Sequence, residues 1–518
     1  MAVTRPNDHI EVTAPAGTVV GISSGGVNVF RGIRFAEAPI GELRFAAPVD
    51  AAPVDEIDAT TFGPVSLQDI DPLPRAVPGT ENNFYAPGIT ASEDCLNLNI
   101  WTGDTDGSAP VLFWIHGGAF LYGSGTGPWT DGSRYAREHG VVVVSVNYRL
   151  GLLGNLWLGD LDPTRSDLAL QDQISALRWV QRNIASFGGD PSRVTIAGQS
   201  AGAMSVAALM TAPAATGLYA RAIVESGHVS AARSVEQALA TREVVLRELA
   251  VDASGDIVAQ LQALSTMRLL QVQREFGIGI LAFPIVTDGV VLPADLLDAV
   301  RAGSAAGVDL IVGTTAEEDR LFSVTGWSNE NATMPSVLSS LLEDPEAEAE
   351  AAELYSDLPG TDRDHQFVIN TDHGWATPAR ALAEAHAAGG NRVFHYDFAR
   401  SSGALDGRVG AAHLAELPFF WGNLDAPGVA SLLGDDVLTD PALIQLAADL
   451  NGTVARFIST GSPDGGPLGS WPAYTEATPD TLVINAESTV VRGHKADRLD
   501  FWASHNSTPA LANVAENS

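Results

Sequence analysis

The sequence predicts an α/β protein in which helices cover both faces of a mainly parallel sheet. Apolar runs typical of buried strands occupy 109–118 ("APVLFWIHGG"), 140–149 ("GVVVVSVNYR") and 193–198 ("RVTIAG"). Between the last two of these runs, residues 166–188 carry apolar side chains at helical spacing. Strands that alternate with helices in this way form parallel sheets that are buried on both faces.

Along the chain, the sequence predicts a hairpin near the start, a long central helix and a helical region after residue 320. The run "VVGISSGGVNVF" (19–30) has paired glycines between two β-like segments, which predicts a hairpin. In the helix at 166–188, Ser166 is the expected N-cap, and Gly188 with Gly189 ends it. From about residue 320 the strand pattern gives way to helical, acidic segments such as "SVLSSLLEDPEAEAEAAELYSDL".

These patterns predict one domain over residues 1–502. Residues 320–390 form a helical cap or side insertion within it, because their helices have no strand partners nearby in the sequence. Residues 503–518 are polar and small, and we expect them to form a disordered tail.

Composition restricts the class of partner. The chain of 518 residues has 45% hydrophobic and 18% charged residues, and its formal charge of −34 is unfavourable for binding nucleic acid or anionic membranes. Neither a signal peptide nor an apolar run of membrane-spanning length is visible, so we expect a cytoplasmic protein. The single cysteine, Cys95, cannot form an intrachain disulfide.

A serine between two glycines occurs twice. "GISSG" (21–25) lies in the predicted hairpin, whereas "GQSAG" (198–202) joins a strand to a helix. The strand–turn–helix context is the one that exposes a nucleophilic serine, so the pattern favours Ser200 over Ser23. Ser200 also falls at the carboxyl end of its strand, where the active sites of parallel sheets lie.

A nucleophilic serine needs a base, an acid that orients the base, and donors for the developing oxyanion. The loop "WIHGGAF" follows a strand, and its Gly117, Gly118 and Ala119 are small enough to let backbone N–H groups approach a substrate oxygen. We expect Gly118, Ala119 and Ala201 to form the oxyanion hole. No ligand set for a metal ion and no nucleotide motif is found, so no cofactor is implied.

Six segments in order carry a resemblance to a known family. They are "FRGIRFAEAPIGELRF", "SEDCLNLNIW", "WIHGGAF", "VVSVNYRLGLLGNL", "FGGDPSRVTIAGQSAG" and "AHLAELPFFWGN". Together they resemble type-B carboxylesterases, the cholinesterase-like branch of the α/β-hydrolases, and especially the bacterial para-nitrobenzyl esterase type. The resemblance implies an α/β-hydrolase fold and a serine esterase.

The resemblance also implies the other two catalytic residues. Glu318 in "VGTTAEEDRLF" matches the family's acid, although Glu317 and Asp319 flank it; Asp288 is the alternative. His413 matches the family's base and completes the chain order serine, acid, histidine. His373 and His395 are interpreted as packing or surface residues.

Departures from the family bear on the substrate. Gln199 stands where cholinesterase-like members have a glutamate, and no tryptophan occurs between Val49 and Ile100, where a cation would stack. Uncharged esters of short to medium acyl chains, or aryl esters, are therefore the expected substrates. Ser226 matches a serine that supports the triad indirectly, and a purely structural serine is the alternative.

Two other functions stay open. Amides, carbamates and lactones also pass through a tetrahedral intermediate, so the same triad could serve them. A binding protein that kept the fold but lost catalysis is the other alternative, against which Ser200, the small residues of the oxyanion loop and His413 argue together. The oligomeric state is not indicated.

Overall fold

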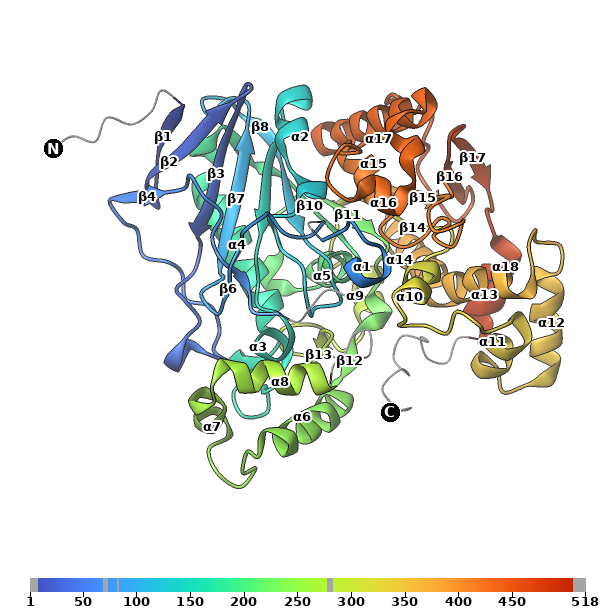
Figure 1. Ribbon diagram of the computed structural model, residues 1–518, viewed down its shortest axis with the longest axis horizontal. Helices are drawn as coiled ribbons and strands as arrows, with labels where there is room; N and C mark the ends of the chain where they lie inside the picture. The colour runs from blue at the N-terminus through green and yellow to red at the C-terminus, as the bar shows by residue number, and fades with distance from the viewer. Residues whose placement is uncertain (1–7, 69–72, 82, 277–282, 506–518) are drawn as a thin grey trace.

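The structure is a computed structural model that describes residues 8–68, 73–81, 83–276 and 283–505. It confirms the predicted mainly parallel sheet with helices on both faces (Figure 1). The sheet has 13 strands in the order β1-β2-β3-β7-β9-β8-β10-β11-β14-β15-β16-β17, and β4 also pairs with β2. The strands are β1 (His9–Ala14), β2 (Gly17–Ser24), β3 (Val27–Arg34), β4 (Glu56–Asp58), β7 (Asn97–Thr102), β8 (Ala109–Ile115), β9 (Val142–Val146), β10 (Gly189–Gln199), β11 (Arg221–Glu225), β14 (Asp309–Thr315), β15 (Val393–Phe398), β16 (Asp480–Ile484) and β17 (Thr489–Arg492).

Parallel pairing dominates the centre of this sheet. Every pairing from β9 through β16 is parallel, whereas β1, β2, β3, β7 and β17 pair antiparallel with their neighbours in the order above. The predicted hairpin is β2 with β3, in which Ser23 is exposed and lies opposite Asn28. Parallel strands end at the same edge, so the carboxyl ends of β8, β10 and β14 lie together.

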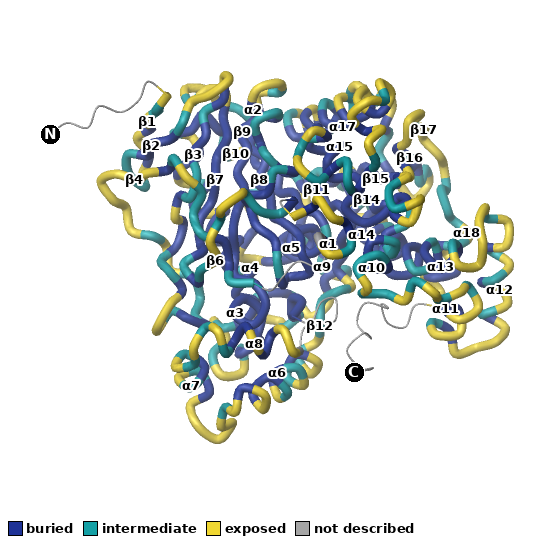
Figure 2. The backbone as a smooth tube through the Cα atoms, viewed as in Figure 1, coloured by how far each residue is buried: buried dark blue, intermediate teal, exposed yellow. Residues whose placement is uncertain are grey.

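The central strands consist mostly of buried residues (Figure 2). Their side chains divide between two apolar cores. In β8, Val111 and Phe113 belong to one core, and Leu112 and Trp114 belong to the other. The first core also includes α4 (Leu168–Asn183), α5 (Ala201–Leu209), α9 (Leu296–Arg301) and α14 (Thr377–Ala388). The second includes α2 (Ser133–His139), α15 (Leu417–Trp421), α16 (Val429–Leu433) and α17 (Pro441–Thr460).

Two helical groups lie outside these layers (Figure 1). One has its own apolar cluster and contains α3 (Gly151–Asn155), α6 (Val235–Leu249), α7 (Ile257–Ala263) and α8 (Thr266–Phe276). The other contains α11 (Met334–Leu341), α12 (Pro345–Tyr355), α13 (Asp362–Thr371) and α18 (Ala496–His505). The helices α11, α12 and α13 of the second group agree with the helices predicted in 320–390, whereas the sequence did not single out the first group. Helix α14 also falls in 320–390, but it packs on the sheet in the first core, so the prediction that the helices of this range have no strand partners is wrong for it. The shorter elements are α1 (Leu73–Ala76), α10 (Asp319–Val324), β5 (Val65–Ser66), β6 (Ala91–Ser92), β12 (Arg233–Ser234) and β13 (Val286–Thr287).

Two predicted boundaries are wrong. Helix α4 begins at Leu168, and its N-cap is Asp167, because the Ser166 hydroxyl instead accepts a hydrogen bond from the Trp157 indole at 3.1 Å. Helix α18 continues to His505, so residues 503–505 are not a disordered tail. The helix is held there because Trp502 is buried and donates to the Tyr355 hydroxyl at 2.7 Å. The rest of the predicted tail, 506–518, lies outside the described residues.

Within residues 8–68, 73–81, 83–276 and 283–505, no helix is long and apolar enough to cross a bilayer.

Candidate active site

Ser200 lies on a sharp turn between β10 and α5. Its backbone has φ 58° and ψ −127°, a conformation that a residue with a side chain rarely adopts. The turn is held because the Ser200 N–H donates to the Glu225 carbonyl of the neighbouring strand at 2.9 Å. This backbone matches the strained strand-to-helix turn that exposes a nucleophile.

The two glycines beside Ser200 allow α5 to approach the sheet closely. A Cβ on Gly202 would lie 2.1 Å from the Ile115 carbonyl oxygen, and one on Gly198 would lie 2.5 Å from the Gly202 backbone. Either contact would be a severe clash, so no side chain fits at these positions. This is the physical reason that a serine stands between two residues without side chains.

Glu318 and His413 meet beside this turn. The His413 Nδ1 donates to Glu318 Oε2 at 2.5 Å, and both side chains are buried. The Thr315 backbone N–H donates to Glu318 Oε1 at 2.8 Å, which fixes the carboxylate on the other side. With the proton on Nδ1, the Nε2 of His413 carries a lone pair and can accept a proton.

The neighbouring carboxylates that could compete with Glu318 point elsewhere. Glu317 pairs with Arg320 at 2.7 Å, and Asp319 accepts a hydrogen bond from Asn370 at 2.9 Å. Asp288, the alternative acid, accepts the backbone N–H groups of the turn that follows it. Of the carboxylates considered for the acid, only Glu318 contacts His413 in the described residues.

The other two histidines considered as bases have packing roles. His373 packs edge-to-face against Trp502 with the ring centres 4.7 Å apart. His395 Nδ1 lies 3.1 Å from the Thr481 hydroxyl, and burial lowers the pKa of His395 to about 4. Both residues agree with their interpretation from the sequence.

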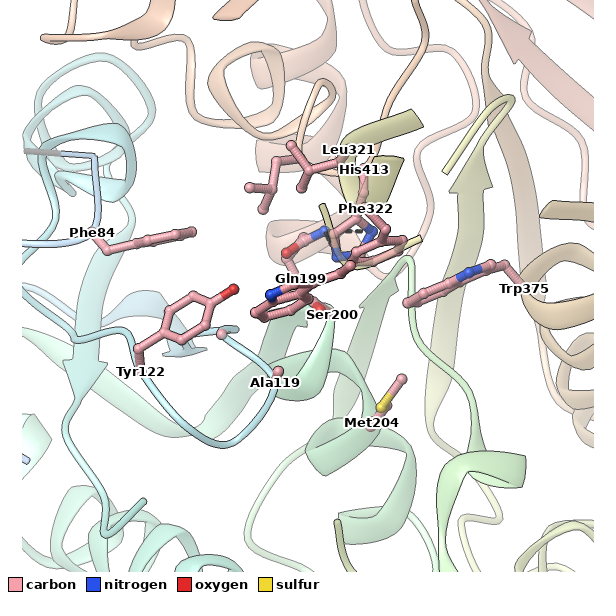
Figure 3. A pocket seen from close by; sticks show the side chains of 13 residues that line it. Phe84, Ala119, Tyr122, Gln199, Ser200, Met204, Leu321, Phe322, Trp375 and His413 are labelled. Carbon is pink, nitrogen blue, oxygen red and sulfur yellow. Dashed lines mark hydrogen bonds between the residues drawn. The ribbon is translucent and has the colours of Figure 1, made fainter. Parts of the chain in front are cut away.

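Ser200 and His413 line one cavity of about 420 Å³ together with Gly118, Ala119 and Gln199. The Ser200 hydroxyl makes no hydrogen bond to His413 within the described residues. Instead, the Gln199 Nε2 lies 3.2 Å from His413 Nε2, as Figure 3 shows. The hydrogen bond between a catalytic serine and its histidine is often long without substrate and tightens in the complex.

Two of the three residues expected to form the oxyanion hole, Gly118 and Ala119, line the same cavity. Gly118 and Ala119 have φ angles of 114° and 55°, and a Cβ on Gly118 would lie 2.0 Å from the Tyr122 carbonyl oxygen. In the part of the chain that the structure describes, the N–H groups of Gly118, Ala119 and Ala201 donate to no protein acceptor. Gly117 is packed against the Ser200 turn, since a Cβ there would lie 2.6 Å from the Gln199 carbonyl oxygen.

Large apolar side chains form the walls of the cavity (Figure 3). They come from residue 84, from the loop after β8, from α5, from α10 and the residues after it, from the segment between α13 and α14, and from the residue after His413. The residues are Phe84, Tyr122, Met204, Leu321, Phe322, Trp327, Trp375 and Leu414. Of the apolar residues after His413, only Leu414 lines this cavity; Leu417, Phe419, Phe420 and Trp421 are core residues.

Trp375 was not recognised from the sequence. It sits in a π-helical turn, Asp372–Ala376, inserted between α13 and α14, and such insertions redirect side chains. Its ring lies 4.9 Å from that of His413 and stacks on Phe322 at 5.7 Å. A π-helical turn has no distinctive residue pattern, so no sequence signal indicated it.

Two further buried carboxylates lie next to the site. The Ser226 hydroxyl donates to Glu416 Oε1 at 3.0 Å, and Glu416 also lies 3.5 Å from Gln199 Nε2. Burial, and then the charge of Glu318, raise the pKa of Glu416 to about 8. Burial also raises the pKa of Glu225 well above its usual range. Ser226 therefore contacts Glu416 and makes no hydrogen bond to Glu318 or His413 within the described residues.

Cys95 agrees with its interpretation as a buried free thiol. Burial raises its pKa to about 12, so the side chain stays a neutral thiol.

The chain matches the model of the carboxylesterase family over residues 8–502. It is 34% identical to the para-nitrobenzyl esterase of Bacillus subtilis, covering 95% of this chain and 98% of that protein. It is 33% identical to the phenmedipham hydrolase of Pseudarthrobacter oxydans, covering 94% of this chain and 97% of that protein. A crystal structure of a carboxylesterase from Geobacillus stearothermophilus superposes with a TM-score of 0.84 at 35% identity, covering 95% of this chain and 99% of that chain. The chain therefore belongs to the carboxylesterase family of α/β-hydrolase enzymes.

Proposed function

We propose that the protein is a serine carboxylic-ester hydrolase that acts on uncharged esters through an acyl-enzyme on Ser200. The observation that carries this proposal is that Ser200 and His413 line one apolar cavity together with Gly118 and Ala119, and that Glu318 contacts His413 Nδ1 from behind. Family membership supports ester hydrolysis, and the contact between Glu318 and His413 supports the roles proposed for these residues.

In the first step, the Ser200 Oγ attacks the ester carbonyl while His413 Nε2 takes the hydroxyl proton. Glu318 holds the resulting imidazolium through Nδ1. The N–H groups of Gly118, Ala119 and Ala201 stabilise the oxyanion. The bond to the alcohol oxygen then breaks, His413 returns the proton to that oxygen, and the acyl group stays on Ser200. Water, activated by His413, repeats the sequence and releases the acid.

Labelling with an organophosphonate tests the nucleophile. The reagent should phosphonylate Ser200 and abolish ester hydrolysis in proportion to the label, because the phosphonyl group mimics the tetrahedral intermediate. Peptide mapping by mass spectrometry locates the adduct. Ser23, exposed on the β2–β3 hairpin, serves as an internal control and should remain unlabelled. Full activity in an unlabelled protein, or a label on Ser23, would contradict the assignment.

The substrate is proposed to be a neutral ester of a short to medium acyl chain or an aryl ester. The cavity walls are apolar, and no carboxylate lines them in the described residues. The segment between Val49 and Ile100 has no tryptophan, although Phe84, Trp327 and Trp375 give the cavity aromatic faces. Cation–π contacts with such faces contribute only about 0.5–2 kcal/mol. Removing an ammonium group from water costs several kcal/mol. The cation–π contact is weaker than this cost and does not compensate for it.

A pair of isosteric substrates checks this substrate class. We expect a neutral ester with a tert-butyl terminus to exceed its trimethylammonium isostere in kcat/KM by at least about tenfold, since burying an unpaired charge is unfavourable. The pair should be compared under saturating and limiting substrate so that KM and kcat are separated. An equal or faster reaction of the cation would contradict the proposal, as would faster hydrolysis of the matched amide or carbamate than of the ester.

A further inference from the structure

Trp375 forms one side of the catalytic cavity. Figure 3 shows it on the opposite side of Ser200 from Phe84 and Tyr122, and all four residues line this cavity. An ester whose carbonyl carbon lies at the Ser200 hydroxyl therefore extends one of its two parts, acyl or alcohol, toward Trp375. The indole of Trp375 limits the space for that part.

The Trp375 ring is packed between other rings. It lies nearly parallel to Phe322, with an angle of 12° and the ring centres 5.7 Å apart, and edge-to-face with His228, also at 5.7 Å. Only 3% of Trp375 is exposed. Because its neighbours leave the side chain little freedom, the position of the ring depends on the backbone that carries it, the π-helical turn Asp372–Ala376.

This turn begins at a buried carboxylate that is held by three side chains. Asp372 is fully buried, and its Oδ2 lies 3.2 Å from Arg498 Nε and accepts a hydrogen bond from the Tyr355 hydroxyl at 3.1 Å. Its Oδ1 lies 3.7 Å from Lys495 Nζ. A buried charge without its partners is strongly unfavourable, so Asp372 stays where these groups are.

The C-terminal helix α18 contacts the next residue of the turn as well. His373 packs edge-to-face on Trp502, and the Trp502 indole donates to the Tyr355 hydroxyl at 2.7 Å. The Tyr355 hydroxyl therefore links Trp502 to Asp372. Arg498 and Trp502 both belong to α18, so this helix fixes the first two residues of the turn that carries Trp375.

We propose that Arg498 and Tyr355 are positioning residues for substrate selectivity, which hold Asp372 and thereby keep the Trp375 ring in place as a wall of the cavity. This inference rests on the proposed esterase function and adds a determinant of ester size that lies outside the cavity lining. π-Helical turns are rare and need support from their surroundings, which the contacts to Asp372 supply. Loss of that support lets the turn and its ring shift, so the limit on ester size is relaxed.

Two series of neutral esters provide the measurement. One series keeps an aryl alcohol and lengthens the acyl chain from acetate to octanoate, and the other keeps acetate and lengthens an n-alkyl alcohol. Each longer ester competes with the shortest member of its series in one mixture. The product ratio then gives the ratio of the two kcat/KM values, which does not depend on how much of the enzyme is folded.

Trp375→Leu tests whether the ring is a wall. The smaller side chain should shift the ratio toward longer esters by about tenfold or more in one of the two series, since space for one methylene changes kcat/KM by at least about this factor. Wild-type ratios in both series would overturn the proposal.

Arg498→Met tests the support of the turn. It should shift the ratio in the same series and in the same direction by about two- to thirtyfold, the size of effect that substitutions acting through packed networks have. Arg498→Lys retains a cation and should restore part of the wild-type ratio. Arg380→Met is the matched control, because its side chain is equally exposed, at 13%, and pairs with Asp500 of α18 at 2.8 Å. Within the described residues Arg380 makes no ion pair with Asp372, so its loss should leave the ratio unchanged.

The combined variant tests whether Arg498 acts through Trp375. In the Trp375→Leu background, Arg498→Met should change the ratio little further, because the ring that it positions is already absent. Tyr355→Phe removes one hydroxyl and gives a second reading if Arg498→Met does not fold. Wild-type ratios in both Arg498→Met and Tyr355→Phe, or an equal effect of Arg498→Met with and without Trp375, would overturn the proposal.

These outcomes are separate from a failure of the esterase assignment. Hydrolysis of the shortest esters, and its loss on phosphonylation of Ser200, test the esterase function alone. An enzyme that hydrolyses those esters but keeps its ratios in the Arg498 and Tyr355 variants retains the proposed function and lacks the proposed positioning.

Discussion

Replacing either Ser200 or His413 by alanine is expected to lower kcat by roughly 10⁴- to 10⁶-fold, and the double variant should be little worse than either single one. The reason is geometric: the His413 Nε2 can act on Ser200 only as part of the unit that Glu318 orients. Without Ser200 there is no hydroxyl proton for His413 to accept, and without His413 there is no base to accept the proton of Ser200. Residual hydrolysis should come from the oxyanion donors and from binding.

The measurement is single-turnover and steady-state hydrolysis of an aryl ester by the two single variants and the double variant. Glu318→Gln should cost less than either alanine, because an amide misorients His413 without removing it. Asp288→Asn is the matched control and should be nearly neutral, since Asp288 only caps its own turn. Multiplicative losses in the double variant would place Ser200 and His413 in separate steps and would contradict the triad.

Much of this site could be predicted because its parts obey local rules. Ser200 needs a particular turn, and that turn requires Gly198 and Gly202, so the requirement is visible in five consecutive residues. The oxyanion loop similarly depends on small residues after a strand. Glu318 and His413 carry no such local signature and were assigned from the resemblance, although the structure places them in contact.

The residues that were missed interact over long sequence separations. Ser226 was singled out from the sequence, but its partner Glu416 was not, because the two residues lie 190 positions apart. Trp375 reaches the cavity through the inserted π-helical turn. Tertiary packing, not local propensity, determines these features.

Replacing Lys495 by methionine is expected to lower the free energy of unfolding by about 3–5 kcal/mol, which is typical of breaking a buried ion pair. Its Nζ lies 2.9 Å from Asp397 on β15 and 3.7 Å from Asp372, which begins the π-helical turn. Burial opposes the charge of Lys495, but the two carboxylates raise its pKa. Without the lysine, buried negative charge would be left with less compensation at the junction of the sheet, this turn and α18.

Chemical denaturation of the variant, followed by tryptophan fluorescence, checks this result. Arg492→Met is the matched control: Arg492 pairs with Asp480 at 2.9 Å but is largely exposed, so its loss should cost only about 0–1 kcal/mol. Adding Asp397→Asn to Lys495→Met should recover part of the loss, since the amide needs no counter-charge at that strand. If Lys495→Met were no more destabilising than Arg492→Met, the buried cluster would contribute packing and not charge compensation. The recovery on adding Asp397→Asn would then also be missing, because the ionised carboxylate would not be what destabilises the variant.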